Sequence, residues 1–225
     1  MARRSAISPR VVIFGAGRMA QFISAAIESD SGREVVGFCV DPGYQMARSL
    51  LGRPVVPVAE VADLVDLATT EALVAVGPQR GLRLREEGLR RLRDLGLVVT
   101  HHVSAHAHVW RDLVIRPNVI IHAGAVIDPF VRLEEGVTIR SNATIGHHSE
   151  VAPSTFVASG AVLGGGVMVG NRCFIGLGSV IRDGVTLAPE TFVGAGAVVT
   201  EDTEPGVYVG VPARRLPGRT IFDAT

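Results

Sequence analysis

The fold of this chain is decided by a six-residue repeat, which residues 143–163 display clearly: ATIGHHSEVAPSTFVASGAVL. An aliphatic residue stands at every sixth position of this stretch, namely Ile145, Val151, Val157 and Leu163. The same spacing continues without a break through seventeen positions, from Val103 to Val199. Neither an α-helix nor a simple strand has this period. A period of six predicts a parallel β-helix, in which short strands alternate with turns and the aliphatic residue points inward.

A second regularity supports the same interpretation. From Ala125 onward, the residue two positions before each aliphatic residue is small or β-branched. Three hexads close one triangular coil, so residues eighteen apart are expected to stack on one another, with coils about 4.8 Å apart. The repeat therefore predicts between five and six coils, which form a prism about 27 Å tall.

Length and composition limit what the rest of the chain can be. The chain has 225 residues, and the repeat covers less than half of them, so we expect a second domain on its N-terminal side. The net charge is zero and the pI is near neutral, which argues against nucleic acid or an anionic membrane as the main partner. All 22 basic residues are arginine, so lysine Schiff-base chemistry is excluded. The two cysteines, Cys39 and Cys173, suggest no disulfide framework. No signal peptide or membrane span is evident, so a cytoplasmic protein is expected.

The N-terminal part carries a glycine motif between a strand and a helix. Val11–Phe14 is a short apolar run typical of a buried parallel strand, and Gly15-Ala16-Gly17-Arg18-Met19-Ala20 follows it, before a helical pattern that extends through Ile27. This G-x-G-x-x-A pattern places backbone N–H groups and a helix N-terminus against a phosphate. A second apolar run, Glu34–Val40, ends at Asp41, where a ribose-binding acid is expected after such a motif. The alternative is a tight turn with Asp41 as an ordinary loop residue.

The remaining N-terminal segments continue this pattern. Further strands are predicted at 55–58, 72–76 and 97–100, and helices at 61–67 and 80–95. Residues 1–98 thus predict alternating strands and helices, βαβαβαβαβ, around an open parallel sheet, a Rossmann-like α/β domain. About 100 residues are too few for a complete NAD-dependent dehydrogenase, so a nucleotide attached to another group is the better interpretation.

The histidines raise two possibilities, a metal site and a catalytic base. γ-class carbonic anhydrases bind metal with two histidines five residues apart and a third about two coils earlier. His101 and His106 have the first spacing, but nothing upstream in the repeat supplies the third ligand, so no metal is predicted. His147 falls at a turn, two residues after the inward Ile145, and should stack between Pro129 and Gly165. A histidine over a glycine leaves room for a ligand to approach the backbone. A solvated turn histidine would occupy the same position.

Several motifs occur together in one known family. They are Gly15-Ala16-Gly17, the strand ending at Asp41, Val74-Ala75-Val76-Gly77, the hexads, and Val209-Gly210-Val211-Pro212-Ala213-Arg214. In this combination the chain resembles the NeuD/PglD-type sugar acetyltransferases of the hexapeptide-repeat superfamily, and the likeness covers almost the whole chain. The resemblance implies a left-handed β-helix, a homotrimer, and acetyl-CoA bound in the groove between adjacent prisms. It also implies three parts: residues 1–98 hold a nucleotide-linked sugar, 99–205 form the β-helical acetyltransferase domain, and 206–225 form a tail near CoA.

The resemblance also assigns roles to residues. His147 matches the family's general base, which takes a proton from the acceptor amine during direct transfer without an acyl-enzyme. Gly165 matches the glycine whose backbone N–H polarises the thioester carbonyl. The nucleotide-contacting positions match Gly15, Gly17, Asp41 and Gly77. The implied contacts to CoA are Gly165, Gly176, Ala195, Gly196, Val211 and Pro212.

Two positions depart from the family pattern. Better-known members follow the catalytic histidine with an acid that orients it, whereas this chain has His148, which becomes a further candidate catalytic residue. Glu150 is a possible substitute for that acid. Phe156 stands where those members carry a second histidine near the acetyl group. It is interpreted as a contact to the sugar or to the pantetheine arm, with packing on a neighbouring prism as the alternative.

The sequence therefore predicts an acetyl-CoA-dependent N-acetyltransferase that acts on a nucleotide-linked amino sugar in the biosynthesis of surface-glycan precursors such as lipopolysaccharide O-antigen. Three alternatives stay open. The first is O-acetylation of a sugar of the sialic acid type, and the second is a non-catalytic trimer that binds sugar nucleotides. The third is a metal-dependent enzyme of the γ-carbonic anhydrase type. UDP, GDP and dTDP are not distinguished as the nucleotide.

Overall fold

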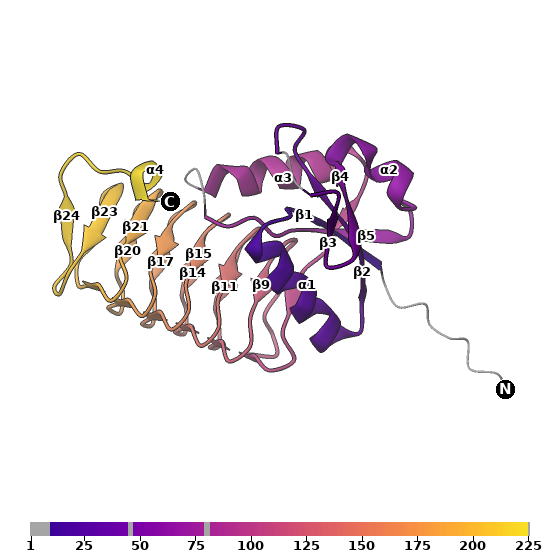
Figure 1. The fold of residues 1–225 in the computed structure, drawn as a ribbon. Coiled ribbons are helices and arrows are strands. Elements are labelled where there is room, and N and C mark those ends of the chain that lie inside the picture. Colours follow the sequence, from indigo (N-terminus) through magenta and orange to yellow (C-terminus); the bar gives the residue numbers. More distant parts are fainter. Residues whose placement is uncertain (1–9, 45–46, 79–81, 225) are drawn as a thin grey trace. The chain divides into compact units, whose positions relative to one another are not determined.

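The computed structural model describes residues 10–44, 47–78 and 82–224. It contains two compact units (Figure 1). The first consists of Met1–Val76 with Gly88–Thr100, and the second of Gly77–Glu87 with His101–Thr225. Both the predicted α/β sheet and the predicted β-helix are confirmed.

The first unit is built around a six-stranded sheet with the order β3-β4-β2-β1-β5-β6. Its strands are β1 (Arg10–Phe14), β2 (Glu34–Val40), β3 (Ser49–Leu50), β4 (Arg53–Pro57), β5 (Thr70–Val74) and β6 (Val98–Val99). Its helices are α1 (Arg18–Ser31), the 3₁₀ turn η1 (Val58–Glu60), α2 (Val61–Leu64) and α3 (Arg83–Asp94), whose first turn belongs to the second unit. Strand β1 lies between β2 and β5 and is parallel to both, and Val11, Val12 and Ile13 are fully buried. The strand order therefore reverses next to β1, which is where α/β sheets bind ligands.

The prediction of strict strand–helix alternation is wrong between β2 and β4. Among the described residues of this segment there is no helix, and the short strand β3 pairs with β4 in an antiparallel hairpin. Leu51 and Gly52 form its two-residue turn with φ of 51° and 74°. Positive φ at both positions is the geometry that matches the twist of a tight hairpin.

The second unit is a parallel β-helix with three faces. The first face has the order β22-β19-β16-β13-β10-β8, comprising Val198–Val199, Val180–Ile181, Val162–Leu163, Thr144–Ile145, Val126–Ile127 and His108–Val109. The second has the order β11-β14-β17-β20, comprising Arg132–Leu133, Glu150–Val151, Met168–Val169 and Thr186–Leu187. The third has the order β24-β23-β21-β18-β15-β12-β9-β7, comprising Arg214–Leu216, Gly206–Val209, Thr191–Val193, Phe174–Ile175, Phe156–Val157, Thr138–Ile139, Ile120–Ile121 and His102–Val103. A short helix, α4 (Ile221–Ala224), packs on β21 and β23.

The hexad repeat forms the interior of this unit as predicted. Each strand pairs with the strand one coil later, for example Ile127 with Ile145, so residues eighteen apart do stack. The aliphatic positions from Ile121 to Val199 are all buried, and so are the small residues two positions before them from Ala125 onward. The first three aliphatic positions, Val103, Val109 and Ile115, are only partly buried at the edge of the same core. The inward residues thus supply the burial energy of the coil, about 1.5–3 kcal/mol for each large aliphatic side chain.

The first turn of α3 is held to the outside of the third face by a buried arginine. Arg85 is 1 % exposed, and its Nη2 donates hydrogen bonds to the Gly136 carbonyl at 2.7 Å and to Thr138 Oγ1 at 2.6 Å. Its guanidinium also lies 6.0 Å from the centre of the Phe156 ring. Burial lowers the pKa of Arg85 to about 10, so the side chain stays charged at neutral pH.

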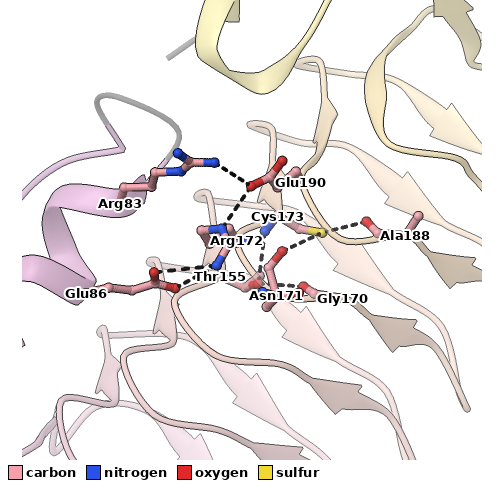
Figure 2. Close-up of polar contacts among 9 residues, drawn as sticks. All are labelled: Arg83, Glu86, Thr155, Gly170, Asn171, Arg172, Cys173, Ala188 and Glu190. Atoms are coloured by element: carbon pink, nitrogen blue, oxygen red, sulfur yellow. Dashed lines mark hydrogen bonds and ion pairs between the residues drawn. The ribbon is translucent and has the colours of Figure 1, made fainter.

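An ion-pair network also joins the first turn of α3 to the β-helix (Figure 2). Arg172 contacts Glu86 Oε1 at 3.2 Å and Glu190 Oε1 at 3.1 Å, and Arg83 reaches the same Glu190 oxygen at 3.5 Å. The carboxylates of Glu86 and Glu190 raise the pKa of Arg172, although desolvation, the largest single contribution, acts in the opposite direction. Arg83 is itself more than half exposed, so its part of the network is screened by water.

Replacing Arg85 by alanine is expected to lower the free energy of unfolding by about 3 kcal/mol, because the Gly136 carbonyl and Thr138 hydroxyl lose a buried donor. Arg83→Ala is the matched control, since it removes an exposed ion pair and should change stability by about 0.5 kcal/mol or less. Urea denaturation of both variants measures the difference. Equal losses would show that Arg85 contributes no more than a surface arginine.

A buried histidine should make the protein sensitive to acid. His122 is 1 % exposed, and desolvation, together with the nearby charge of Arg140, lowers its pKa to about 3. The Nη1 of Arg140 lies 3.3 Å from His122 Nε2. As the pH falls below about 6.5, the unfolded chain binds a proton at this residue that the folded chain does not bind. Stability is therefore fully present above that pH and declines between about pH 6.5 and about pH 3.

The test compares wild type with His122→Gln by urea denaturation at about pH 7 and about pH 5. Wild type is expected to lose about 1–2 kcal/mol more than the variant between these conditions, because glutamine does not titrate. The same loss in both proteins would assign the acid sensitivity to other groups.

Candidate functional site

The candidate site of the second unit lies at the corner between β13 and β14, which carries His147 and His148. Ser149 holds this corner to the next coil: its Oγ donates to the Gly164 carbonyl and accepts from the Val167 N–H, both at 3.0 Å. The Gly166 N–H donates to the His147 carbonyl at 2.7 Å. These bonds fix the backbone of the corner, while the side chains of both histidines are exposed.

The imidazole of His147 lies directly against Gly165, as the eighteen-residue spacing predicts. A Cβ atom at Gly165 would lie 2.5 Å from His147 Cε1 and 2.7 Å from Nε2. Any side chain at position 165 would therefore displace the ring. The glycine leaves the ring in contact with the backbone, next to an accessible surface.

His148 provides the polar partner of His147. The two Nδ1 atoms are 3.1 Å apart, and the rings meet edge to face at an interplanar angle of 87°. For this contact to be a hydrogen bond, one of the two Nδ1 atoms must carry a proton. With the proton on His147 Nδ1, its Nε2 carries the lone pair that a general base needs.

Two neighbouring groups complete this corner. Glu150, considered above as a replacement acid, forms an ion pair with Arg132 rather than an interaction with the histidines. The ring of Phe130 lies against His148, with 4.7 Å between the ring centres. Phe130 and His148 both line a groove of about 460 Å³ on this side of the β-helix.

The backbone N–H of Gly165 already has a partner that sequence reasoning missed. It donates a hydrogen bond of 2.6 Å to Asp183 Oδ1. Asp183 is exposed and lies eighteen residues after Gly165, so the stacking rule would have identified it. A carboxylate thus occupies the donor that the resemblance assigns to the thioester carbonyl.

Apart from Gly165, the β-helix residues predicted to contact CoA occupy the other edge of the first face. Gly176, Ala195 and Gly196 lie at the corners that precede β19 and β22, whereas His147 and Gly165 lie at corners that follow strands of this face. Ala195 and Gly196 are exposed, and Gly176 is buried between coils, with its N–H donated to the Val193 carbonyl.

The tail residues and the face itself complete this surface. Val211 and Pro212 are exposed, and the adjacent Ala213 N–H donates to the Val198 carbonyl at 2.7 Å, which holds the tail on the last coil. Between the two edges, the face presents the partly exposed side chains of Val162 and Val180. The predicted catalytic and CoA positions therefore border one continuous apolar strip.

The interpretation of Phe156 as a contact to substrate or to a neighbouring prism is not supported by its position. Its ring is 5 % exposed and stacks on Phe174 at 5.5 Å, and Phe174 stacks on Phe192 at 4.8 Å. Arg85 covers the ring from the other side. Phe156 belongs to an aromatic ladder on the outer side of the third face, and the first turn of α3 covers it there.

The first unit carries the glycine motif at the end of β1. Gly15 has φ of +119°, and a Cβ there would lie 2.8 Å from the Ala75 carbonyl oxygen, so only glycine fits. Gly17 is the N-cap residue of α1, with open space where a side chain would lie. These two residues bring the backbone to the surface at the point where the strand order reverses.

Asp41 follows β2 in the same unit and forms an ion pair of 2.6 Å with Arg91 of α3. A pocket of about 200 Å³ lies beside Asp41, and Tyr44 and Arg48 are among its lining residues. The sequence did not indicate the pairing with Arg91, because the two residues are far apart in the chain. Gly77, the remaining predicted nucleotide contact, groups with the second unit.

Burial makes the two cysteines poor nucleophiles. Cys39 and Cys173 are buried free thiols, and burial raises the pKa of each to about 12. Within the ranges that the structure describes, no three His, Cys, Asp or Glu side chains are grouped so that they could hold a metal ion. None of the helices in these ranges combines the length and the apolar character needed to cross a lipid bilayer.

Comparisons with known proteins agree with this architecture. Two family models match the repeat: bacterial transferase hexapeptide (six repeats) at residues 112–147, and hexapeptide repeat of succinyl-transferase at residues 166–201. A search of curated proteins finds no significant match.

Three solved structures are similar to almost the whole chain. PerB from Caulobacter crescentus, in complex with CoA and GDP-perosamine, is 27 % identical with a TM-score of 0.83, covering 92 % of this chain and 96 % of its own. The acetyltransferase domain of PglB from Neisseria gonorrhoeae, in complex with acetyl coenzyme A, is 22 % identical with a TM-score of 0.82, covering 93 % and 100 %. WeeI from Acinetobacter baumannii is 19 % identical with a TM-score of 0.74, covering 92 % and 99 %. The chain thus carries hexapeptide repeats and is similar over almost its whole length to acetyltransferases that combine such a repeat with an α/β unit.

Proposed function

We propose that this enzyme transfers the acetyl group of acetyl-CoA directly to the amine of a nucleotide-linked amino sugar, with His147 as the general base. The observation that carries the proposal is the imidazole of His147, which lies against Gly165 on an accessible corner of the β-helix. PerB, which was solved with CoA and GDP-perosamine, supports both the donor and the class of acceptor.

In the proposed reaction, the amine lone pair attacks the thioester carbonyl carbon and a C–N bond forms. His147 Nε2 takes the proton that the nitrogen must lose, while His148 Nδ1 accepts the hydrogen bond from His147 Nδ1–H. The C–S bond then breaks, and the CoA sulfur leaves as thiolate and is protonated. Both cysteines are buried and protonated at neutral pH, which agrees with transfer that does not pass through an acyl-cysteine.

The Gly165 N–H is the proposed donor to the oxyanion, a role worth roughly 3 kcal/mol in comparable sites. The Asp183 carboxylate must turn away from this N–H when the thioester binds. Its exposure allows that rotation, because the carboxylate exchanges the bond for hydrogen bonds to water.

We further propose that the pantetheine arm follows the apolar strip of the first face toward Ala195, Gly196, Val211 and Pro212. The nucleotide is assigned to Gly15, Gly17, Asp41 and Gly77. A homotrimer, in which this strip faces a neighbouring prism, is part of the proposal, and the molar mass in solution tests it.

The test is a thiol-release assay with acetyl-CoA against UDP-, GDP- and dTDP-linked amino sugars and free sialic acid. We expect release with one of the sugar nucleotides, and mass spectrometry should show one added acetyl group on its amine. Release with sialic acid alone would assign the enzyme to O-acetylation. No release with any acceptor, while CoA still binds, would contradict the proposed function.

A further inference from the structure

We propose that Phe130 is a positioning residue, which holds the ring of His148 so that its Nδ1 faces His147. The inference rests on the proposed role of His147 as general base. It assigns a role to the side chain of Phe130, which neither the conformation of this corner nor burial explains.

The backbone of Phe130 is in the left-handed region, with φ of +65°. The β-helix imposes this conformation at every sixth position from Asn118 to Gly196, and glycine and asparagine, such as Gly124 and Asn142, adopt it most readily. The fold therefore accounts for the conformation at position 130, but it does not account for a bulky aromatic residue in that conformation.

Burial does not provide that explanation. The Phe130 side chain is 71 % exposed, so it gains little from removal of apolar surface from water. An asparagine would adopt the same backbone conformation more readily and would expose no ring. Phe130 is therefore less favourable for stability than asparagine, both because of its backbone conformation and because of its exposed ring.

What Phe130 does contact is His148. The rings are 4.7 Å apart at an interplanar angle of 38°, within the range of favourable aromatic pairs. His148 is also in the left-handed region, with φ of +61°, and its N–H donates to the Pro129 carbonyl at 3.2 Å, directly before Phe130. One coil later the equivalent position is Gly166, which has no side chain to pack on the imidazole. Of the two coils next to His148, only the coil of Phe130 thus has a side chain at this position that can pack on the imidazole.

The contacts form a short series from Phe130 to His148 to His147, and the last one is the 3.1 Å contact between the Nδ1 atoms. If the His148 ring rotates away, His147 loses the partner that holds its proton on Nδ1. The proton of His147 can then move to Nε2, and in that tautomer Nε2 has no lone pair with which to accept a proton. Removal of the Phe130 ring should therefore lower kcat and leave the binding of acetyl-CoA unchanged.

The experiment measures steady-state kinetics and thermal stability for Phe130→Asn, Phe130→Tyr and His148→Ala. Phe130→Asn is expected to lower kcat about 10-fold, a part of what general base catalysis contributes. Its KM for acetyl-CoA and its melting temperature should be equal to or better than those of wild type. Phe130→Tyr should restore most of kcat, because it keeps the ring. The double variant Phe130→Asn/His148→Ala should be no slower than His148→Ala alone.

Leu51→Asn is the matched control. Leu51 is also an exposed apolar residue with positive φ, but it lies in the hairpin turn of the α/β sheet. This variant should show the same relief of strain with an unchanged kcat. A wild-type kcat in Phe130→Asn would overturn the inference. So would a lower melting temperature with loss of oligomer, which would place the ring in a subunit interface.

A readout without turnover separates this inference from the proposed function. The imidazole C–H resonances of His147 and His148 should shift in Phe130→Asn and not in Leu51→Asn. If wild type acetylates none of the acceptors, the proposed function fails, and these NMR shifts still decide the position of His148. Unshifted resonances would overturn the inference by themselves.

Discussion

Replacing His147 by alanine is expected to lower kcat by about 100-fold or more, because no other group on this corner can take the proton from the attacking amine. His148 contacts His147 through Nδ1, and Glu150 is paired with Arg132, so neither is placed to substitute for it. The binding of CoA should be nearly unchanged, since its proposed contacts are the apolar strip and the far corner. Thiol release measures kcat, and calorimetry with CoA measures binding.

The matched control for this variant is His106→Ala, which removes another exposed histidine from a corner of the β-helix. It should keep wild-type turnover. Unchanged turnover in His147→Ala would contradict the assignment of the base. A parallel loss of CoA binding would instead indicate that His147 contributes to the binding site rather than to proton transfer.

Adding a single methyl group at Gly165 should have nearly the same effect as removal of the base. The Cβ of Gly165→Ala would lie 2.5 Å from His147 Cε1 and 2.7 Å from Nε2, so the imidazole must swing away. The nearest atoms belong to a flexible side chain and not to backbone, so the coil itself can keep its conformation. We expect kcat to fall by about 100-fold or somewhat less, because a displaced ring still returns occasionally.

The double variant His147→Ala/Gly165→Ala tests whether the methyl group acts through the imidazole. If it does, the second substitution costs nothing further in the absence of His147, and the two effects are strongly non-additive. Additive losses would show that position 165 acts independently, for example through the approach of the thioester to its N–H. The melting temperature of Gly165→Ala should stay close to that of wild type.

The hexad spacing alone was sufficient to predict the β-helix, because the inward position is a local property of each strand and turn. From the spacing it also followed that His147 stacks on Gly165, since residues eighteen apart lie one coil apart. The apolar runs around Gly15 predicted the parallel sheet for a similar reason: each buried strand is a continuous stretch of sequence. The short antiparallel strand β3 was missed, because a two-residue strand has no periodicity to detect.

Only the tertiary structure decided which side chains meet across elements. It placed Arg85 over Phe156, paired Asp41 with Arg91, and brought Asp183 to the N–H of Gly165. It also brought the rings of His147, His148 and Phe130 into contact. Hydrophobic periodicity records whether a residue points inward or outward. The partner of an outward side chain depends on rotamers and on segments distant in the chain, and these acquire definite positions only when the whole chain packs.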